Sequence, residues 1–356
     1  MHLDTTLFPE EYTRHVRKKA FLLGAGVILL FTVILVSLSL GAAVVPLDEI
    51  IRVLFGDSSS RKWHSIIFNI RLPRVLTAVI AGIGLSVSGT AIQSILRNPL
   101  GSPITLGISQ AAAFGAALSV MIFGTGIMQS TGTGAIIITN PSLTTIFAFV
   151  FCMLVTVLLV GISALKQTQP MIMVLAGISL GFLFQAGTMF LQFFADDVQL
   201  AAMVFWTFGD VGRTSWQEFF IILGTACAAF VYFFTQRWNY NALDAGDETA
   251  KSLGVRVSLT RIIGLSCAAL VTAVIISFVG IIGFIGLVCP HITRRILGDD
   301  HRFLLPGSAI TGAIVLLAAD TAARLILIPH VFPVAILTAF LGVPVFIFLI
   351  IRGARR

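Results

Sequence analysis

Charged residues are scarce in this chain of 356 residues. Only 11% are Asp, Glu, Lys or Arg, against ~25% in typical soluble domains, while 57% are hydrophobic. This balance excludes an ordinary soluble enzyme and predicts an all-α, polytopic membrane protein. The bases outnumber the acids, 23 to 16, but they are scattered between apolar runs, so the composition does not indicate a nucleic-acid partner.

Cysteines are few as well, and they offer no site. All four, Cys152, Cys227, Cys267 and Cys289, lie within or at the ends of apolar runs, so we expect no disulfide. His291 stands two residues after Cys289, which on a helix turns the two side chains about 200° apart. Because no second Cys/His pair is available, we predict that the chain binds no metal and no cofactor of its own.

A nucleotide-binding loop is also missing. The sequence contains no G-x-x-x-x-G-K-[ST] segment, whose backbone N–H groups and lysine would hold the phosphates. The chain is therefore not expected to hydrolyse ATP.

Long apolar runs dominate what is present. The first, 20–45, follows a polar tail over 1–19 and is longer than the roughly 7–15-residue core of a signal peptide, so we predict that it is retained as a membrane span. An amphipathic segment, Leu47 to Phe55, is expected at the membrane surface after it. Nine more spans are predicted at 74–96, 104–126, 143–165, 171–194, 217–236, 259–279, 281–297, 308–328 and 333–351. The ten spans form one domain, 20–352, followed by a tail over 353–356.

The bases predict the orientation of these spans. Ten spans put both termini on one side, and that side carries sixteen of the 23 Lys and Arg residues, while the opposite side carries seven. Because Lys and Arg concentrate in cytoplasmic loops, we predict that both termini are cytoplasmic.

A polar segment interrupts the apolar runs at Asn239 to Arg261. Asp247 and Glu248 begin a short stretch that ends near Lys251, with Gly254 just beyond it. Acids at the first turn, a base at the last and glycine as the stop predict a two-turn helix. Two interpretations of this segment are open: an ordinary solvated loop, or a surface that another protein contacts.

Polar side chains also lie within the predicted spans. In the fifth span Gln185, Thr188 and Gln192 share one helical face, with Phe193 beside them, and Gln93 lies on a face of small residues in the second span. An unpaired amide in hydrocarbon is costly, so these faces must contact protein or a water-filled path. Both interpretations, interhelical contact and translocation path, remain open.

Three arginines run against the predicted orientation. Arg71 and Arg74 flank a proline at the outer mouth of the second span, and Arg324 follows Asp320 by one helical turn. Asp320 is the one acid well inside a span, and Arg324 is placed to neutralise it along one helix face. Anchoring at the membrane interface and contact with an acidic partner are both consistent with the arginines.

Many separate motifs together resemble the iron-siderophore and vitamin B12 permeases, the FecCD/BtuC type of ABC importer subunit, over roughly residues 70–350. They are Arg71-Leu72-Pro73-Arg74, Gly89, Gln93, Arg97-Asn98-Pro99-Leu100, Pro103, Leu106-Gly107, Leu253-Gly254, Gly283-Phe284-Ile285-Gly286-Leu287-Val288, Pro290-His291, Asp300-His301-Arg302, Leu305-Pro306, Ala319-Asp320, Arg324, Pro333 and Gly342-Val343-Pro344. Glu248, Ala250 and Gly254 also match the E-x-A-x-x-x-G spacing of importer permeases. The chain departs from the family pattern at Cys289 and at Ala245.

The resemblance implies a BtuC-like permease that works with partners. These are a second permease copy or paralogue, two ATPase subunits that bind ATP and Mg²⁺, and a periplasmic or lipid-anchored binding protein. It implies chelated iron (a siderophore) as substrate, with haem or cobalamin as alternatives, and the cytoplasmic (inner) membrane of a bacterium as location. An ion-coupled secondary transporter is the alternative of another class.

The resemblance also implies roles for individual residues. The coupling loop, 239–258, would contact the ATPase; the arginines would dock the binding protein; a turn would end the second span on the cytoplasmic side. The residues are, for ATPase coupling, Asp247, Glu248, Ala250, Lys251, Leu253 and Gly254; for docking, Arg71, Arg74 and Arg324; for the translocation path, Gln185, Thr188, Gln192, Phe193 and Gln93; and for the turn, Arg97, Asn98 and Pro99.

Overall fold

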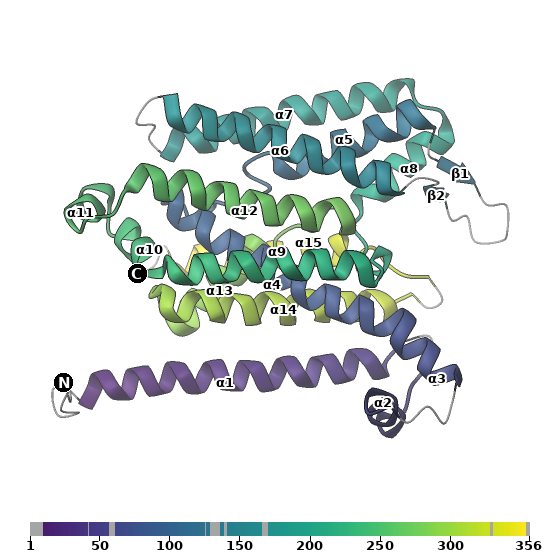
Figure 1. Ribbon diagram of the computed structural model, residues 1–356, viewed down its shortest axis with the longest axis horizontal. Coiled ribbons are helices and arrows are strands. Elements are labelled where there is room, and N and C mark those ends of the chain that lie inside the picture. The colour runs from purple at the N-terminus through teal and green to yellow at the C-terminus, as the bar shows by residue number, and fades with distance from the viewer. Residues whose placement is uncertain are drawn as a thin grey trace.

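The computed structural model describes residues 10–41, 43–56, 61–124, 126–128, 136–138, 141–165, 170–327 and 330–353. The long helices lie side by side in one bundle (Figure 1). The helices are α1 (Glu10–Ser39), α2 (Leu47–Leu54), α3 (Arg61–Ser65), α4 (Leu72–Ile95), α5 (Ile108–Phe123), α6 (Pro141–Leu165), α7 (Pro170–Phe194), α8 (Asp197–Thr207), α9 (Trp216–Thr235), α10 (Arg237–Asp244), α11 (Asp247–Ser252), α12 (Val257–Val279), α13 (Ile285–Leu297), α14 (His301–Leu325) and α15 (Val334–Gly353). A π-helical segment, η2 (Ile66–Arg71), joins α3 to α4, and a 3-10 turn, η3 (Val211–Arg213), follows α8.

A multi-pass membrane protein is confirmed by the apolar helices. Within the described ranges, seven helical segments are long and apolar enough to cross a bilayer, among them α1, the continuous segment Arg61–Ile95 and α12. The helices α5, α13 and α15 correspond to the three remaining predicted spans but are not among these seven, so the number of ten spans stays a prediction. Among the residues that the structure describes, the one departure from an all-α fold is a small antiparallel hairpin of β1 (Gly126–Met128) and β2 (Ile136–Ile138).

Several helix boundaries differ from the predicted ones for local reasons. Two helices begin four residues late: α5 follows Gly107, whose φ is +75°, and α13 follows Phe284, whose φ is +66°. A left-handed residue cannot continue a right-handed helix, so each marks a start. The segment between the fifth and sixth predicted spans contains α8, which begins with a capping box between Asp196 and Gln199. The amphipathic segment is the helix α2, as predicted, and buries Ile50 and Val53.

The helix α4 is the centre of the packing. It is buried along most of its length and contacts α14, α12, α9 and α13. Glycines allow the closest approaches: a Cβ added at Gly82 would overlap the backbone of Gly312, and one at Gly89 would overlap the Gly286 carbonyl group. Small residues therefore bring these backbones into direct contact.

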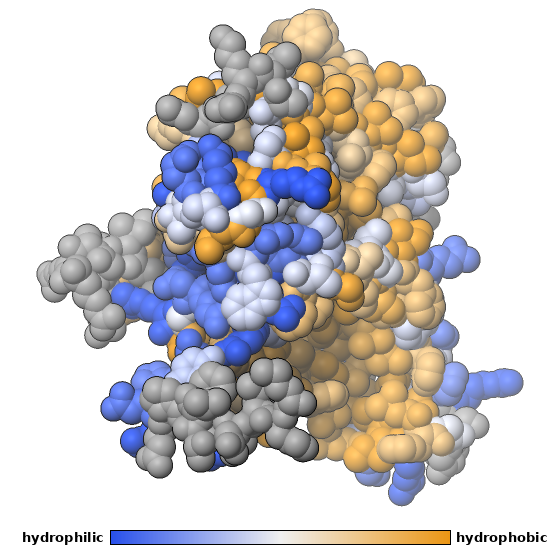
Figure 2. Space-filling view, turned by 60° about the vertical axis from the view of Figure 1, so that its left-hand side comes forward, coloured by the Kyte–Doolittle hydropathy of each residue, from blue (hydrophilic) through white to orange (hydrophobic). Residues whose placement is uncertain are grey.

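The two ends of the bundle differ in character. The chain begins and finishes at the end where α10 and α11 lie, while β1, β2 and α2 lie at the other end (Figure 1). Figure 2 shows that the surface at the α11 end is hydrophilic, whereas the flank beside it is hydrophobic. The described part of the chain therefore starts, at Glu10, and ends, at Gly353, on the same side; the cytoplasmic location of both termini stays a prediction.

Candidate functional site

The predicted short helix in the polar segment is present as α11. It begins after Gly246, at φ +119°, and its chain reverses at Gly254, at φ +82°. Both backbone conformations are in the region that glycine enters freely, so the glycines set the two ends of the helix. The preceding helix, α10, was not predicted.

One face of α11 points outward. The Glu248 side chain is 88% exposed and accepts a hydrogen bond from Lys251 Nζ at 2.8 Å, which raises the pKa of Lys251. Leu253, just after the helix, is 68% exposed, whereas Ala250 is fully buried. Ala250 instead holds α11 against the bundle.

The inner face of α11 is held by an arginine that the sequence did not single out. Arg261, on α12, donates from both terminal nitrogens to the two Asp247 oxygens, at 2.9 and 2.7 Å. Its Nε donates to the Ile95 carbonyl oxygen at the end of α4, at 3.1 Å. Arg97 Nη1 lies 3.7 Å from Asp247 as well. A two-pronged arginine–carboxylate bond has a defined geometry, so Arg261 joins α11 to α12 and, through the Ile95 carbonyl oxygen, to the end of α4.

The predicted turn follows α4 at this same end. Arg97 has φ +45°, the Asn98 side chain accepts a hydrogen bond from the Leu100 N–H at 2.9 Å, and His291 Nε2 lies 2.9 Å from the Pro99 carbonyl oxygen. Because a carbonyl only accepts, His291 is the donor there. The turn is therefore tied to α13.

A buried histidine adds a third connection to α4. His301 Nε2, at the start of α14, lies 2.9 Å from Ser94 Oγ and 3.0 Å from Asp244 Oδ2 on α10. The Asp244 carboxylate is two residues before Gly246, so this cluster supports the segment from which α11 begins. Sequence reasoning missed this group, since its members are up to 207 residues apart.

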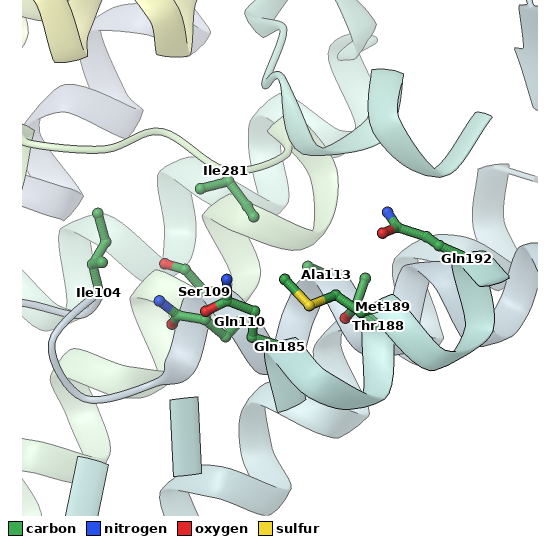
Figure 3. A pocket seen from close by; sticks show the side chains of 9 residues that line it. All are labelled: Ile104, Ser109, Gln110, Ala113, Gln185, Thr188, Met189, Gln192 and Ile281. Carbon is green, nitrogen blue, oxygen red and sulfur yellow. The ribbon is translucent and has the colours of Figure 1, made fainter. Parts of the chain in front are cut away.

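The polar face of α7 lines a cleft of about 280 Å³. Gln185, Thr188 and Gln192 come together there, as their shared helical face predicted, and Figure 3 shows Gln185 beside α5 side chains with Gln192 farther along. The lining consists of Ile104, Ser109, Gln110, Ala113, Gln185, Thr188, Met189, Gln192 and Ile281.

Two of the predicted path residues lie outside this lining. Phe193 is 83% exposed on the surface of the isolated subunit. Gln93 is 2% exposed in the interior and donates to the Leu287 carbonyl oxygen at 3.3 Å, which joins α4 to α13.

The predicted pair of Asp320 and Arg324 is present, at 3.2 Å, and a third residue joins it. Arg74 donates to the fully buried Asp320 carboxylate at 2.8 and 3.0 Å and lies 3.3 Å from Asp210. Arg71, at 6% exposure, donates to backbone carbonyl oxygens at and just after the C-terminal end of α1, including that of Ser39 at 2.8 Å.

The three outer arginines are thus turned inward and join α1, α4 and α14. Their docking role stays a prediction, and it rests on the small part of each guanidinium group that is exposed. Reversing all three charges would also remove Arg74 and Arg324, the two partners of the buried Asp320. A loss of docking in such a variant would therefore reflect misfolding before it reflected a lost contact with the binding protein.

Within the described ranges, no three His, Cys, Asp or Glu side chains are grouped as a metal site would require.

The chain is similar to known transport proteins along nearly its whole length. The FecCD transport family matches residues 28–352. The chain is 47% identical over 351 residues to a Methanocaldococcus jannaschii protein assigned as an ABC transporter permease, covering 98% of this chain and 99% of that protein. It is 37% identical to the hemin transport system permease protein HmuU of Yersinia pestis, over 90% of this chain and 93% of HmuU. A solved inward-facing conformation of a metal-chelate type ABC transporter has a TM-score of 0.78 and 27% identity, covering 93% of this chain and 99% of that chain.

Proposed function

The chain belongs to the FecCD transport family, and we propose that it is the importer permease subunit that moves chelated iron, as a siderophore complex, across the cytoplasmic membrane. The observation that carries the proposal is a polar cleft between membrane-spanning helices in a chain whose relatives include hemin and metal-chelate transporters. Haem and cobalamin are the alternatives within the same machinery.

Uptake measurements test the choice of substrate. Cells without other iron importers would express the chain with a candidate ATPase and binding protein from the same organism, and accumulation of ⁵⁵Fe from a ferric siderophore would be measured. We expect uptake to require all three proteins and to persist in excess haem or cobalamin. Haem or cobalamin uptake without siderophore uptake would contradict the proposed substrate.

An ion-coupled carrier is disfavoured by the pairing of Asp320. Such a carrier needs an ionisable group that can release its partner near the midplane. Asp320 is fully buried and shared between Arg74 and Arg324. We therefore assign the energy source to a partner ATPase.

We place the ATPase contact at α11 and the second permease copy along α7. The helix α11 lies at the hydrophilic end of the bundle (Figures 1 and 2), and the side chains of Glu248, Lys251 and Leu253 are exposed there. On α7, Phe190 and Phe193 are more than half exposed beside the cleft residues, which is suited to burial against a second apolar helix.

Replacing Gly254 by proline should uncouple ATP hydrolysis from uptake. Proline cannot adopt a φ of +82°, and it removes the N–H that Gly254 donates to the Lys251 carbonyl oxygen at 2.9 Å. We expect uptake by the reconstituted complex to fall about tenfold or more while ATP hydrolysis continues, because a distorted α11 no longer passes movement of the ATPase through Asp247 to Arg261.

The matched control is Gly56→Pro at the other end of the bundle. Gly56 has a φ of +87°, ends the short helix α2 and donates its N–H to Val53 at 3.2 Å. The Gly56→Pro substitution should leave the coupling of ATP hydrolysis to uptake unchanged. Wild-type uptake in a normally inserted Gly254→Pro variant would show that α11 does not couple.

Cysteines along α7 test the path. Cysteines at 185, 188 and 192 should react with a small water-soluble thiol reagent at rates that depend on nucleotide state, because the cleft opens and closes to water. A cysteine at 183, about 200° from 185 on the helix, should not react, because it points away from the cleft. Uniform protection of all four positions would favour interhelical contact instead of a path.

A further inference from the structure

Two helices begin in the interior of the bundle and run in opposite directions. From Ile108, α5 runs toward the hairpin end, and from Ile285, α13 runs toward the α11 end (Figure 1). With 13 residues, α13 is about 20 Å long, about two thirds of the hydrocarbon thickness, so its start lies at depth. Pro103 and Ile104, just before α5, lie beside Gly286 and Gly283 at the start of α13.

The converging starts bring two positive helix ends into the membrane interior. A helix N-terminus carries about half a positive charge and leaves backbone N–H groups without intrahelical acceptors. In the part of the chain that the structure describes, neither the Ser109 N–H nor the Gln110 N–H has an acceptor. Both residues line the cleft that contains Gln185.

The Ser109 hydroxyl is an independent sign of a ligand. Ser109 is 2% exposed, and its Oγ has no hydrogen-bond partner among the described residues; the buried Gln110 Oε1 also has none. A buried hydroxyl left unpaired costs free energy, whereas a ligand atom in the cleft would satisfy it. Figure 3 shows Ser109, Gln110 and Gln185 near one another at one end of the cleft.

The position of this helix start is set by glycine. Gly107, at φ +75°, packs against the backbone at Gly177 and Gly181 of α7, where a Cβ would meet the Gly177 carbonyl oxygen at 2.7 Å. The first turn of α5 is therefore held against the polar face of α7. The cleft lining contains neither carboxylates nor basic side chains, so the helix end supplies its main electrostatic feature.

We propose that the first turn of α5 is a binding site for a negatively charged oxygen of the transported chelate. Carboxylate, hydroxamate and catecholate oxygens have the required charge and acceptor capacity, whereas a bare metal cation would find no charged ligand there. The Ser109 hydroxyl, the two free N–H groups and the Gln110 amide would contact the oxygen. This inference rests on the proposed transport function and adds the chemistry that the cleft selects.

The local charge preference can be measured without knowing the substrate. Ser109→Cys, Gln110→Cys and Gln192→Cys would be made in the full chain with Cys227→Ala and Cys267→Ala, and reconstituted in lipid. Each thiol would react with methanethiosulfonates of similar size, one anionic (sulfonatoethyl) and one cationic (trimethylammonioethyl). We expect the anionic-to-cationic rate ratio at 109 and 110 to exceed that at 192 about five- to tenfold. Excess Fe³⁺-citrate should slow the reaction at 109.

Ser88→Cys is the matched control. Ser88 is likewise fully buried with an unpartnered hydroxyl, but it lies on α4 outside the cleft lining, so it should react with neither reagent. Equal ratios at 109, 110 and 192, modification of 192 without 109 or 110, or equally fast reaction at 88 would each overturn the site. Lack of iron uptake would contradict the proposed function without changing these ratios.

Discussion

Asp320→Ala should lower the free energy of unfolding by about 3–5 kcal/mol and abolish transport. The carboxylate is fully buried and lies 2.8 Å from Arg74 Nη2 and 3.2 Å from Arg324 Nε. Its removal leaves two guanidinium groups uncompensated in the interior, and buried charges without partners are far more costly than exposed ones. The loss also removes the ion pair that joins Arg74 of α4 to Asp320 of α14. Denaturation in mixed micelles, together with an uptake assay, would measure both effects.

Asp299→Ala is the control for removing a carboxylate. Asp299 is 77% exposed and lies 3.5 Å from Arg294, so this pair should contribute about 0–1 kcal/mol. If Asp320→Ala destabilised the protein no more than Asp299→Ala, the buried charge network would not be a major source of stability.

Gly89→Ala should prevent normal packing of α4 against α13. The added Cβ would overlap the Gly286 carbonyl group, which is backbone and cannot rotate away. Overpacking of this kind costs about 1–3 kcal/mol, and a rigid neighbour puts it at about 3 kcal/mol or above. We expect most of the protein to be lost from the membrane and the remainder to transport poorly, as measured by the amount of folded protein and its uptake rate.

The same substitution at two other glycines should have smaller effects. Gly84→Ala meets the end of the Ile275 side chain, which can move, so its effect should be milder. Gly161→Ala, on α6, meets no atom within 4 Å and should be neutral or slightly stabilising, because alanine favours helix. Equal effects at all three positions would show that close backbone contact at Gly89 is unimportant.

The fold was largely predictable because the bilayer simplifies the folding problem. Backbone groups in hydrocarbon must be paired within a helix, so each long apolar run predicted a helix. The helix starts at Ile108 and Ile285 were placed four residues too early, because hydrophobicity continues through residues 104–107 and 281–284 while the backbone conformation does not. The second half of the chain also contains α10 and the start of α14, which depend on polar caps and contacts with α4 that periodicity does not show.

Which residues of the functional surfaces lie on the same face of one helix was also predictable, because helix geometry fixes their spacing. Gln185, Thr188 and Gln192 share a helical face whatever surrounds them, and Asp320 and Arg324 are one turn apart on any helix. Gly254, just after α11, has a positive φ, which residues other than glycine rarely adopt. Its position in the sequence therefore predicted where the helix ends.

Which partner each face meets is a property of the packed bundle. Arg74 reaches Asp320 across 246 positions of sequence, and Arg261 joins Asp247 to the Ile95 carbonyl oxygen across 166. Ser109 and Gln110 carry no pattern that connects them with α7; they meet its polar face because Gly107 fits against Gly177 and Gly181. Helix formation depends on neighbours three or four residues away, whereas these contacts depend on how side chains of different volume allow whole helices to approach, and that is settled only when the helices pack together.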